Sequence, residues 1–450
     1  MGLGSTFKRL LPASGTTSDF PEDAFDRASP TPQFGTAPRT IQDRAASAVL
    51  HRDEVIDAKT RIVGYRFHVR SPSGAPALRP GAVIDALKAE AVTTFAQRRM
   101  ALIPLTVEEW HAADYRQFVA PKTVFVVAAP RPDEDLAGWS AGIEEIRRSG
   151  VRLAFQGADA GERFAGSLRK GDLALVNFRD FPLHAFDQLV QALRRQHPGA
   201  GLAVESVSSW PERRLCVARG AEYCLGEFVA QRDEEEPGQL NQSRLVLIEM
   251  LNLLRKDADL TALTAVAKRD PAVAVHILSM ANSPAARAGR TVASLEQAMM
   301  VLGRAQLYRW ISISMFRAGS SGNRDEALLE MALARARFLE LIALASGAKS
   351  TADELFLVGL LSLLDCLLGL PMPAILAKLS LPAEVEEVLL RSQGPYARPL
   401  ALAIAVERGH SEQWASLAQL LEIDPAQIQS ATVAALAWAE EAISAPRAQG

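Results

Sequence analysis

Two hydrophobic patterns divide the chain, and they change near residue 230. Before that point, short runs such as TVFVVA at 123–128 and LALVNF at 173–178 are apolar almost throughout. Such runs are typical of parallel strands that are buried on both faces. After that point no strand pattern recurs, and segments of helical character follow one another with short breaks at Gly, Pro or Asp-Pro. An α/β domain followed by an all-α domain is therefore predicted.

The first part alternates strand-like and helix-like segments. Its strands are predicted at 48–57, 61–70, 101–106, 123–128, 151–155, 172–178, 201–206 and 223–228, the first two around a turn at 57–60. Helices are predicted near 80–99, 107–118, 133–148, 160–169, 182–196 and 209–219. Eight strands with crossover helices predict a (β/α) barrel or a close relative. The segment is shorter than a typical barrel of this kind, so some of the helices are expected to be missing or short.

The second part is read as helices throughout. They are predicted at 240–256, 259–268, 271–282, 294–303, 304–317, 324–346, 352–369, 371–379, 383–392, 396–408, 411–422 and 425–444. The charged stretch AQRDEEEPGQ at 230–239 is the predicted linker, which leaves a barrel at 46–229 and a helical domain at 240–445. Residues 1–45 are expected to be a disordered tail, because Gly, Pro, Ser and Thr fill 19 of the first 40 positions.

Composition narrows the function classes only slightly. The net charge of −3 offers no overall positive field for nucleic acid, so DNA binding is not predicted. The three cysteines have no metal-binding spacing and are expected to be buried thiols in a reducing compartment. The chain shows neither a membrane-spanning apolar run nor a signal peptide, so a cytoplasmic protein is expected.

The segment from Asp270 to Gly303 carries the most specific pattern. Asp270 is a predicted N-cap, and Pro271 stands in the first helical turn, where its missing N–H costs nothing. Asn282 and Ser283 then break the helix and are expected to hold the following loop through side-chain hydrogen bonds to the backbone. A second helix begins with a capping box at Ser294, and Gly303 is its predicted C-cap.

The order D-P, A-N-S, then S-L-x-x-A and L-G resembles the HDOD domain. That family is related to the HD phosphohydrolases but lacks their metal-binding His and Asp, and the resemblance implies a signalling or scaffold module. The alternative is a plain helical pair with Asn in a tight turn. Arg287 and Arg290 in the intervening loop are candidates for a partner or anion surface, or are simply solvated.

A second resemblance lies in the barrel. The segments VIDAKTRIVGYRFHVR, ALIPLT, SGVRLAFQG, AVESVSSW and GAEYCLGEF, in that order, resemble an EAL domain. EAL domains are (β/α) barrels that hydrolyse cyclic di-GMP with two divalent metals, which carboxylates, an Asn and a Lys hold. Here the family's positions fall on Arg66, Pro104, Val127 or Ala128, Gln156, Gly157, Leu175, Glu205 and Leu225. Glu205 alone keeps its family residue, as a vestige or as an ordinary polar residue at the end of a strand.

The metal motif of the HD enzymes is also altered. Gly359-Leu360-Leu361 is followed by Ser362 and Leu363 where those enzymes have His and Asp, and no His occurs between residues 334 and 342. Together, the barrel and the helical domain resemble the EAL–HDOD (YuxH-like) bacterial signalling proteins. No catalytic residue, cofactor or metal site is predicted, and the chain is expected not to be an enzyme.

Three hypotheses follow from these resemblances. The first is a non-enzymatic signalling adaptor in which the HDOD helices bind a protein partner and the barrel is a scaffold or a surface for forming a homo-oligomer. The second is a cyclic di-GMP receptor that uses the degenerate barrel, with Arg66, Arg70, Arg152 or Arg179 facing the phosphates. The third is an active phosphodiesterase with unconventional residues.

Overall fold

The computed structural model describes residues 49–70, 80–89, 92–112, 114–128, 130, 135–157, 167–235, 240–282, 292–318 and 323–444. The tail expected at 1–45 therefore lies outside the described residues. Contacts divide the described residues into two compact units, of which the barrel unit lies within 49–231 and 404–416 and the helical unit lies within 232–403 and 417–444. Among the described helices, none combines the length and the apolar character that crossing a membrane requires.

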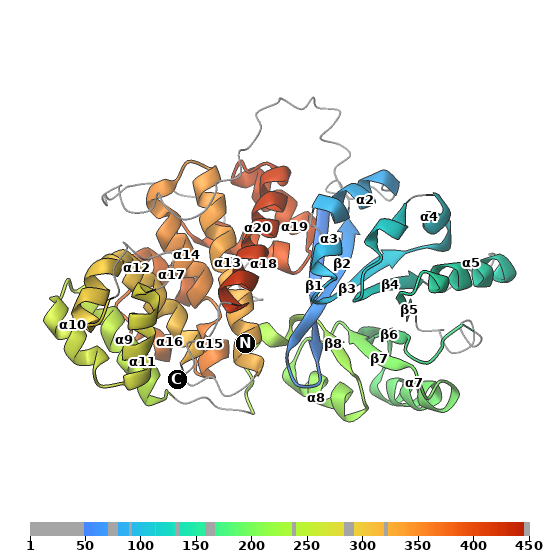
Figure 1. Cartoon of the computed structure of the whole chain (residues 1–450), viewed down its shortest axis with the longest axis horizontal. Coiled ribbons are helices and arrows are strands. Elements are labelled where there is room, and N and C mark those ends of the chain that lie inside the picture. Colours follow the sequence, from blue (N-terminus) through green and yellow to red (C-terminus); the bar gives the residue numbers. More distant parts are fainter. Residues whose placement is uncertain are drawn as a thin grey trace. The chain divides into compact units, whose positions relative to one another are not determined.

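The barrel unit contains a closed eight-stranded barrel whose strands follow one another in chain order (Figure 1). The strands are β1 (Val49–Asp57), β2 (Ile62–Arg70), β3 (Met100–Leu105), β4 (Thr123–Ala128), β5 (Arg152–Gln156), β6 (Leu173–Asn177), β7 (Gly201–Glu205) and β8 (Tyr223–Leu225). Strand β1 is antiparallel to β2 and β8, whereas the other neighbours are parallel. The predicted barrel is confirmed, and all eight strands lie within a few residues of their expected positions.

The hairpin between β1 and β2 is closed by side-chain chemistry. Asp57 Oδ1 accepts hydrogen bonds from the backbone N–H groups of Lys59 and Arg61, both at 2.9 Å. Thr60 takes the left-handed conformation with φ 65°. The expected turn at 57–60 therefore fixes which β1 and β2 residues face each other.

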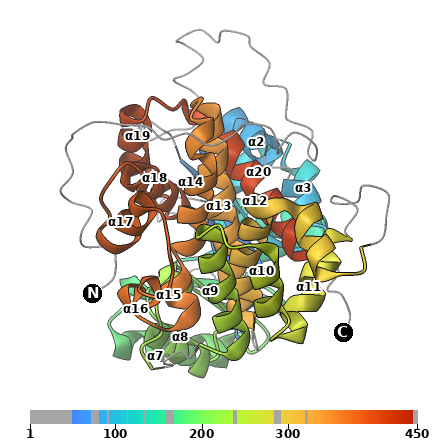
Figure 2. The ribbon, with the colours of Figure 1, turned by 90° about the vertical axis from the view of Figure 1, so that its left-hand side faces the viewer.

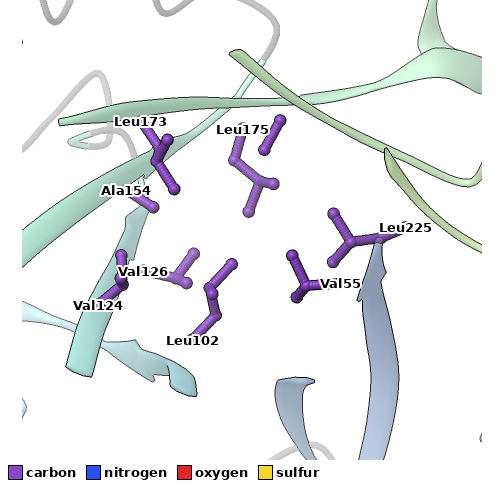
Figure 3. Packing of buried hydrophobic residues seen from close by; sticks show 9 residues of the cluster. Val55, Leu102, Val124, Val126, Ala154, Leu173, Leu175 and Leu225 are labelled. Atoms are coloured by element: carbon purple, nitrogen blue, oxygen red, sulfur yellow. The ribbon is translucent and has the colours of Figure 1, made fainter. Parts of the chain in front are cut away.

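Helices and short 3₁₀ turns connect the parallel strands. They are α2 (Pro80–Ala89), α3 (Val92–Phe95), α4 (Val107–Ala112), η2 (Tyr115–Phe118), α5 (Leu136–Arg148), η3 (Phe178–Asp180), α7 (Leu183–Gln196), α8 (Trp210–Ala218) and η4 (Glu227–Ala230). Most of the helix expected at 160–169 lies outside the described residues. Figure 3 shows the apolar cluster inside the barrel, which consists of Val55, Leu102, Val124, Val126, Ala154, Leu173, Leu175, Ala203 and Leu225.

The helical unit confirms the predicted all-α part. Its elements are α9 (Gln242–Arg255), α10 (Leu260–Ala267), α11 (Pro271–Ala281), α12 (Leu295–Arg317), α13 (Asn323–Ala345), η5 (Lys349–Thr351), α14 (Ala352–Leu361), α15 (Leu364–Leu368), α16 (Met372–Leu376), α17 (Ala383–Arg391) and α20 (Pro425–Ser444). Two further helices, α18 (Ala397–Glu407) and α19 (Ser411–Leu420), contain the segment 404–416 that groups with the barrel.

Helix α13 is the long central helix of this unit and contacts α12, α14 and α20 (Figure 2). Its approach to α14 requires a glycine, because a Cβ on Gly359 would lie 2.6 Å from the backbone Cα of Ala336. Gly359 therefore lies where α13 and α14 approach each other too closely to leave room for a side chain.

Candidate functional site at the carboxyl end of the barrel

Polar residues gather where the parallel strands end. In register, Asp53 on β1 faces Arg66 on β2, and His51 faces His68. Because side chains alternate along a strand, Asp53 and Arg66 share the interior face with Val55 of the apolar cluster. On β7, Glu205 lies two residues beyond Ala203 of the same cluster and so faces the interior as well. Ends of this kind carry the active sites of (β/α) barrels.

Arg66 and Glu205 form an ion pair across the barrel interior. Their side chains are only 7% and 12% exposed. Burial lowers the pKa of Arg66 to about 10, although the Asp53 carboxylate opposes that shift. The second oxygen of Glu205, Oε1, is buried and has no hydrogen-bond partner among the described residues. Glu205 therefore depends on Arg66 for its charge compensation.

Asp53 is held by two histidines. His51 Nε2 lies 2.9 Å from Asp53 Oδ1, and His68 Nε2 lies 2.8 Å from Oδ2. Burial by itself raises the pKa of Asp53, but hydrogen bonds and charge from both histidines hold that pKa well below its ordinary value. Burial lowers the pKa of His68 by more than the bond to Asp53 raises it. The carboxylate is therefore ionised, and both of its oxygens are occupied.

His51 connects Asp53 to the backbone of the same unit. Its Nε2 faces the Asp53 carboxylate, and its Nδ1 lies 3.1 Å from the carbonyl oxygen of Val406. Both of these neighbouring oxygens are hydrogen-bond acceptors. The cluster therefore holds one guanidinium, that of Arg66, beside two carboxylates, those of Asp53 and Glu205.

The remaining EAL-like positions are largely apolar. Leu175 and Leu225, which fall on the family's Lys and Gln, belong to the cluster that fills the barrel (Figure 3). On β4, alternation with Val126 shows that Ala128, and not Val127, faces the interior. In the residues that the structure describes, no group of three or more His, Cys, Asp or Glu side chains is placed to hold a metal ion.

The motif in the helical unit has the predicted caps. Asp270 is buried and its Oδ1 accepts from the backbone N–H groups of Ala272 and Val273 at 2.8 and 3.3 Å. Pro271 is the first residue of α11. Gly303 has φ 70° and ψ 165° and kinks α12 at the end of its first segment. That conformation is essentially restricted to glycine, which explains the break predicted there.

Asn282 joins the two ends of the segment 283–291. Its Nδ2 donates to the carbonyl oxygens of Leu278 and Val292, and its Oδ1 accepts from the N–H of Val292, all at 2.9 Å. The side chain therefore acts like a short piece of backbone between α11 and α12. The other predicted surface residues, Ser283, Arg287 and Arg290, lie outside the described residues.

An arginine also occupies the altered HD motif. Arg335 on α13 donates from Nη1 to Ser362 Oγ at 2.7 Å, and that hydroxyl donates to the Gly359 carbonyl oxygen at 2.7 Å. Both Arg335 and Ser362 are buried. The sequence pattern indicated Ser362 but not Arg335. The signal that could have revealed Arg335 is the position of this charged residue within the apolar pattern of α13.

Comparisons with known proteins agree with this architecture. The HDOD domain model matches residues 241–371. YuxH of Bacillus subtilis is 28% identical over 247 residues, which span 54% of this chain but only 59% of YuxH. The cyclic di-GMP phosphodiesterase CdgJ of Vibrio cholerae is 22% identical over 327 residues, which cover 71% of this chain and 73% of CdgJ. The EAL-domain protein YkuI of B. subtilis, solved with cyclic di-GMP and calcium, has a TM-score of 0.32 and 13% identity over 41% of this chain and 55% of YkuI.

The chain therefore has an EAL-like barrel followed by an HDOD domain, and one of its relatives, CdgJ, is a cyclic di-GMP phosphodiesterase. The expectation that it is not an enzyme is wrong, because CdgJ, which aligns with most of this chain, is a phosphodiesterase. That expectation rested on matching motif letters one by one. A hydrolytic site needs only side chains that converge in space, and several strands of a barrel can supply them.

Proposed function

We propose that this chain is a cyclic di-GMP signalling protein in which the barrel recognises the dinucleotide and the HDOD domain binds a protein partner. The observation that carries the proposal is the buried guanidinium of Arg66 at the carboxyl end of the barrel. A guanidinium fork matches the oxygens of a phosphodiester, and such contacts are strongest where water is excluded. The similarity to CdgJ supports the choice of ligand.

Isothermal titration of the full chain with cyclic di-GMP, with and without Mg²⁺, tests the barrel's part. The expected result is saturable binding to the wild type that disappears in the double variant Arg66→Met/Glu205→Gln. Removing both charges avoids leaving one buried charge unpaired. Chromatography of the same samples measures any linear product. The absence of binding up to about 1 mM ligand would remove the barrel from the proposal.

The partner-binding role rests on a separate observation. The two helices of the HDOD motif expose large apolar side chains, namely Val275 on α11 at 50%, and Met300 and Val301 on α12 at 62% and 45%. Apolar side chains that share one exposed surface mark protein interaction sites, and we infer that these three belong to such a surface.

A pull-down with the full chain as bait tests this role. We expect a specific protein to be retained by the wild type and to be lost with Val275→Asp/Met300→Asp. The matched control is Leu344→Asp, which changes an apolar residue of similar exposure (42%) on α13. Equal retention by all three baits would refute the use of this surface.

A further inference from the structure

Arg66 is the natural anion-binding group of the barrel, but another group already occupies it. Its guanidinium pairs with Glu205, and both side chains are almost fully buried. Because Arg66 lies beside two carboxylates, those of Asp53 and Glu205, the cluster has no excess positive charge to offer an incoming phosphodiester. An anion therefore has to displace one of the two carboxylates.

Asp53 is not the carboxylate that leaves. Both of its oxygens accept hydrogen bonds from histidine nitrogens, at 2.8 and 2.9 Å. The His51 ring is fixed in turn by the Val406 carbonyl oxygen, which lies 3.1 Å from its Nδ1. Moving Asp53 would break both of its histidine contacts at once and leave two partly buried ring nitrogens without their acceptor.

Glu205 is the releasable carboxylate. Its contact with Arg66 is its only ion pair within the described residues, and its Oε1 has no hydrogen-bond partner there. It is also the last residue of β7, and Ser206 turns the chain away with φ 58°. On the neighbouring strand β6, Asn177 lies opposite Glu205, but the Asn177 side-chain oxygen already accepts a hydrogen bond from the N–H of Arg179 at 3.0 Å. Glu205 can therefore move without breaking a second contact.

The depth of the site limits where the ligand lies. Below the ion pair the interior is filled by apolar side chains, including Leu102, Leu175 and Leu225 (Figure 3). This packing closes the approach to Arg66 from within the barrel, so a phosphate group that binds Arg66 stops at the level of the ion pair.

We propose that Arg66 is a phosphodiester-binding subsite and that Glu205 is its built-in competitor, which occupies the guanidinium until the ligand displaces it. This inference rests on the proposed function and specifies its site. It predicts that the wild type binds weakly, because part of the binding free energy is used to release Glu205. Neutralising Glu205 while keeping its shape should strengthen binding.

The test compares the wild type, Glu205→Gln and the double variant Arg66→Met/Glu205→Gln by titration with cyclic di-GMP and, separately, with inorganic phosphate. Glu108→Gln on α4 is the matched control, because it makes the same chemical change at an exposed position of the same unit. Glu205→Gln should bind cyclic di-GMP at least about tenfold more tightly than the wild type. Binding should be lost in the double variant and unchanged in the control, with circular dichroism confirming that all four proteins are folded.

The outcomes separate this inference from the proposed function. If the wild type binds and Glu205→Gln binds equally or more weakly, the competitor role is overturned while the barrel remains a receptor. If Glu205→Gln binds phosphate but neither protein binds cyclic di-GMP, the anion subsite stands and the dinucleotide role falls. If neither the wild type nor Glu205→Gln binds either ligand, both proposals are overturned.

Discussion

Asn282 offers the sharpest test of how the HDOD motif is held together. Its side chain makes three hydrogen bonds of 2.9 Å to backbone atoms on both sides of the segment 283–291. A net contribution of about 0.5–1.5 kcal/mol per bond gives about 1.5–4.5 kcal/mol for the set. The Leu278 carbonyl oxygen also accepts the backbone N–H of Asn282 at 3.1 Å, so it keeps one partner when the side chain is removed. We therefore expect Asn282→Ala to cost about 2–3 kcal/mol.

An isosteric variant separates the hydrogen bonds from packing. Asn282→Asp keeps the acceptor for the Val292 N–H, but it loses both donors and sets a carboxylate beside two carbonyl oxygens. It should therefore destabilise the helical unit at least as much as Ala, although it has nearly the same volume. If packing were the main effect, Asp would instead be close to the wild type.

Hydrogen exchange of the full chain is the appropriate assay, because a chain with two units need not unfold in one step. Both variants should speed exchange at the Val292 amide and in peptides spanning the end of α11. The control Asn252→Ala removes two bonds of 2.7 Å, one to the Lys378 carbonyl oxygen and one from the Ser380 N–H. It should speed exchange at Ser380 and leave Val292 unchanged. Unaltered protection of Val292 in Asn282→Ala would refute the reasoning.

Three further predictions concern stability, each measured by hydrogen exchange of the full chain in the unit that carries the change. Asp270→Ala removes the acceptor for two N–H groups of α11 and should cost about 1–2 kcal/mol, most of which Asp270→Ser should restore. Gly303→Ala should cost about 1–3 kcal/mol through backbone strain alone, because its Cβ would meet nothing within 4 Å; equal stability would contradict the kink. The pKa of Asp53 is lowered in the folded state, so its stabilisation is present above the unfolded pKa of about 3.9 and is lost as pH falls below it. Asp53→Asn should therefore flatten the loss of stability between about pH 5 and 3, and a slope equal to that of the wild type would argue against the histidine contacts.

Elements held by local chemistry could be predicted from the sequence. The caps at Asp270 and Ser294 and the break at Gly303 depend on neighbouring backbone, so the letters are sufficient. The barrel strands were recognisable because buried parallel strands are apolar on both faces. Helix ends shifted by a residue or two, since terminal turns are weakly fixed.

Contacts across the barrel could not be predicted in the same way. Arg66 and Glu205 lie on strands that are not neighbours, and they meet only because eight strands close around a narrow interior. From the sequence, Arg66 is therefore interpreted as a replaced metal ligand or a phosphate-facing residue, and Glu205 as a lone vestige or an ordinary polar residue, without a link between the two. The neighbourhood of Asp53 and the histidines could have been predicted from the sequence. A hairpin that turns at 57–60 sets Asp53 opposite Arg66 and His51 opposite His68, and counting residues back from the turn gives this register.

The two altered motifs share a physical solution. In the barrel, Arg66 stands where the EAL resemblance places a metal-binding carboxylate, and it compensates Glu205. In the helical unit, Arg335 reaches Ser362, which stands where the HD resemblance places a metal-binding histidine. A guanidinium carries a fixed charge and several donors, so it can satisfy buried polar groups at sites built around a cation. Unlike a metal ion, the guanidinium is always present in the site. Which acceptor it binds depends on which neighbouring anion competes best for it. For that reason Glu205, whose only ion pair among the described residues is with Arg66, is the position at which a change of one charge should alter ligand binding most.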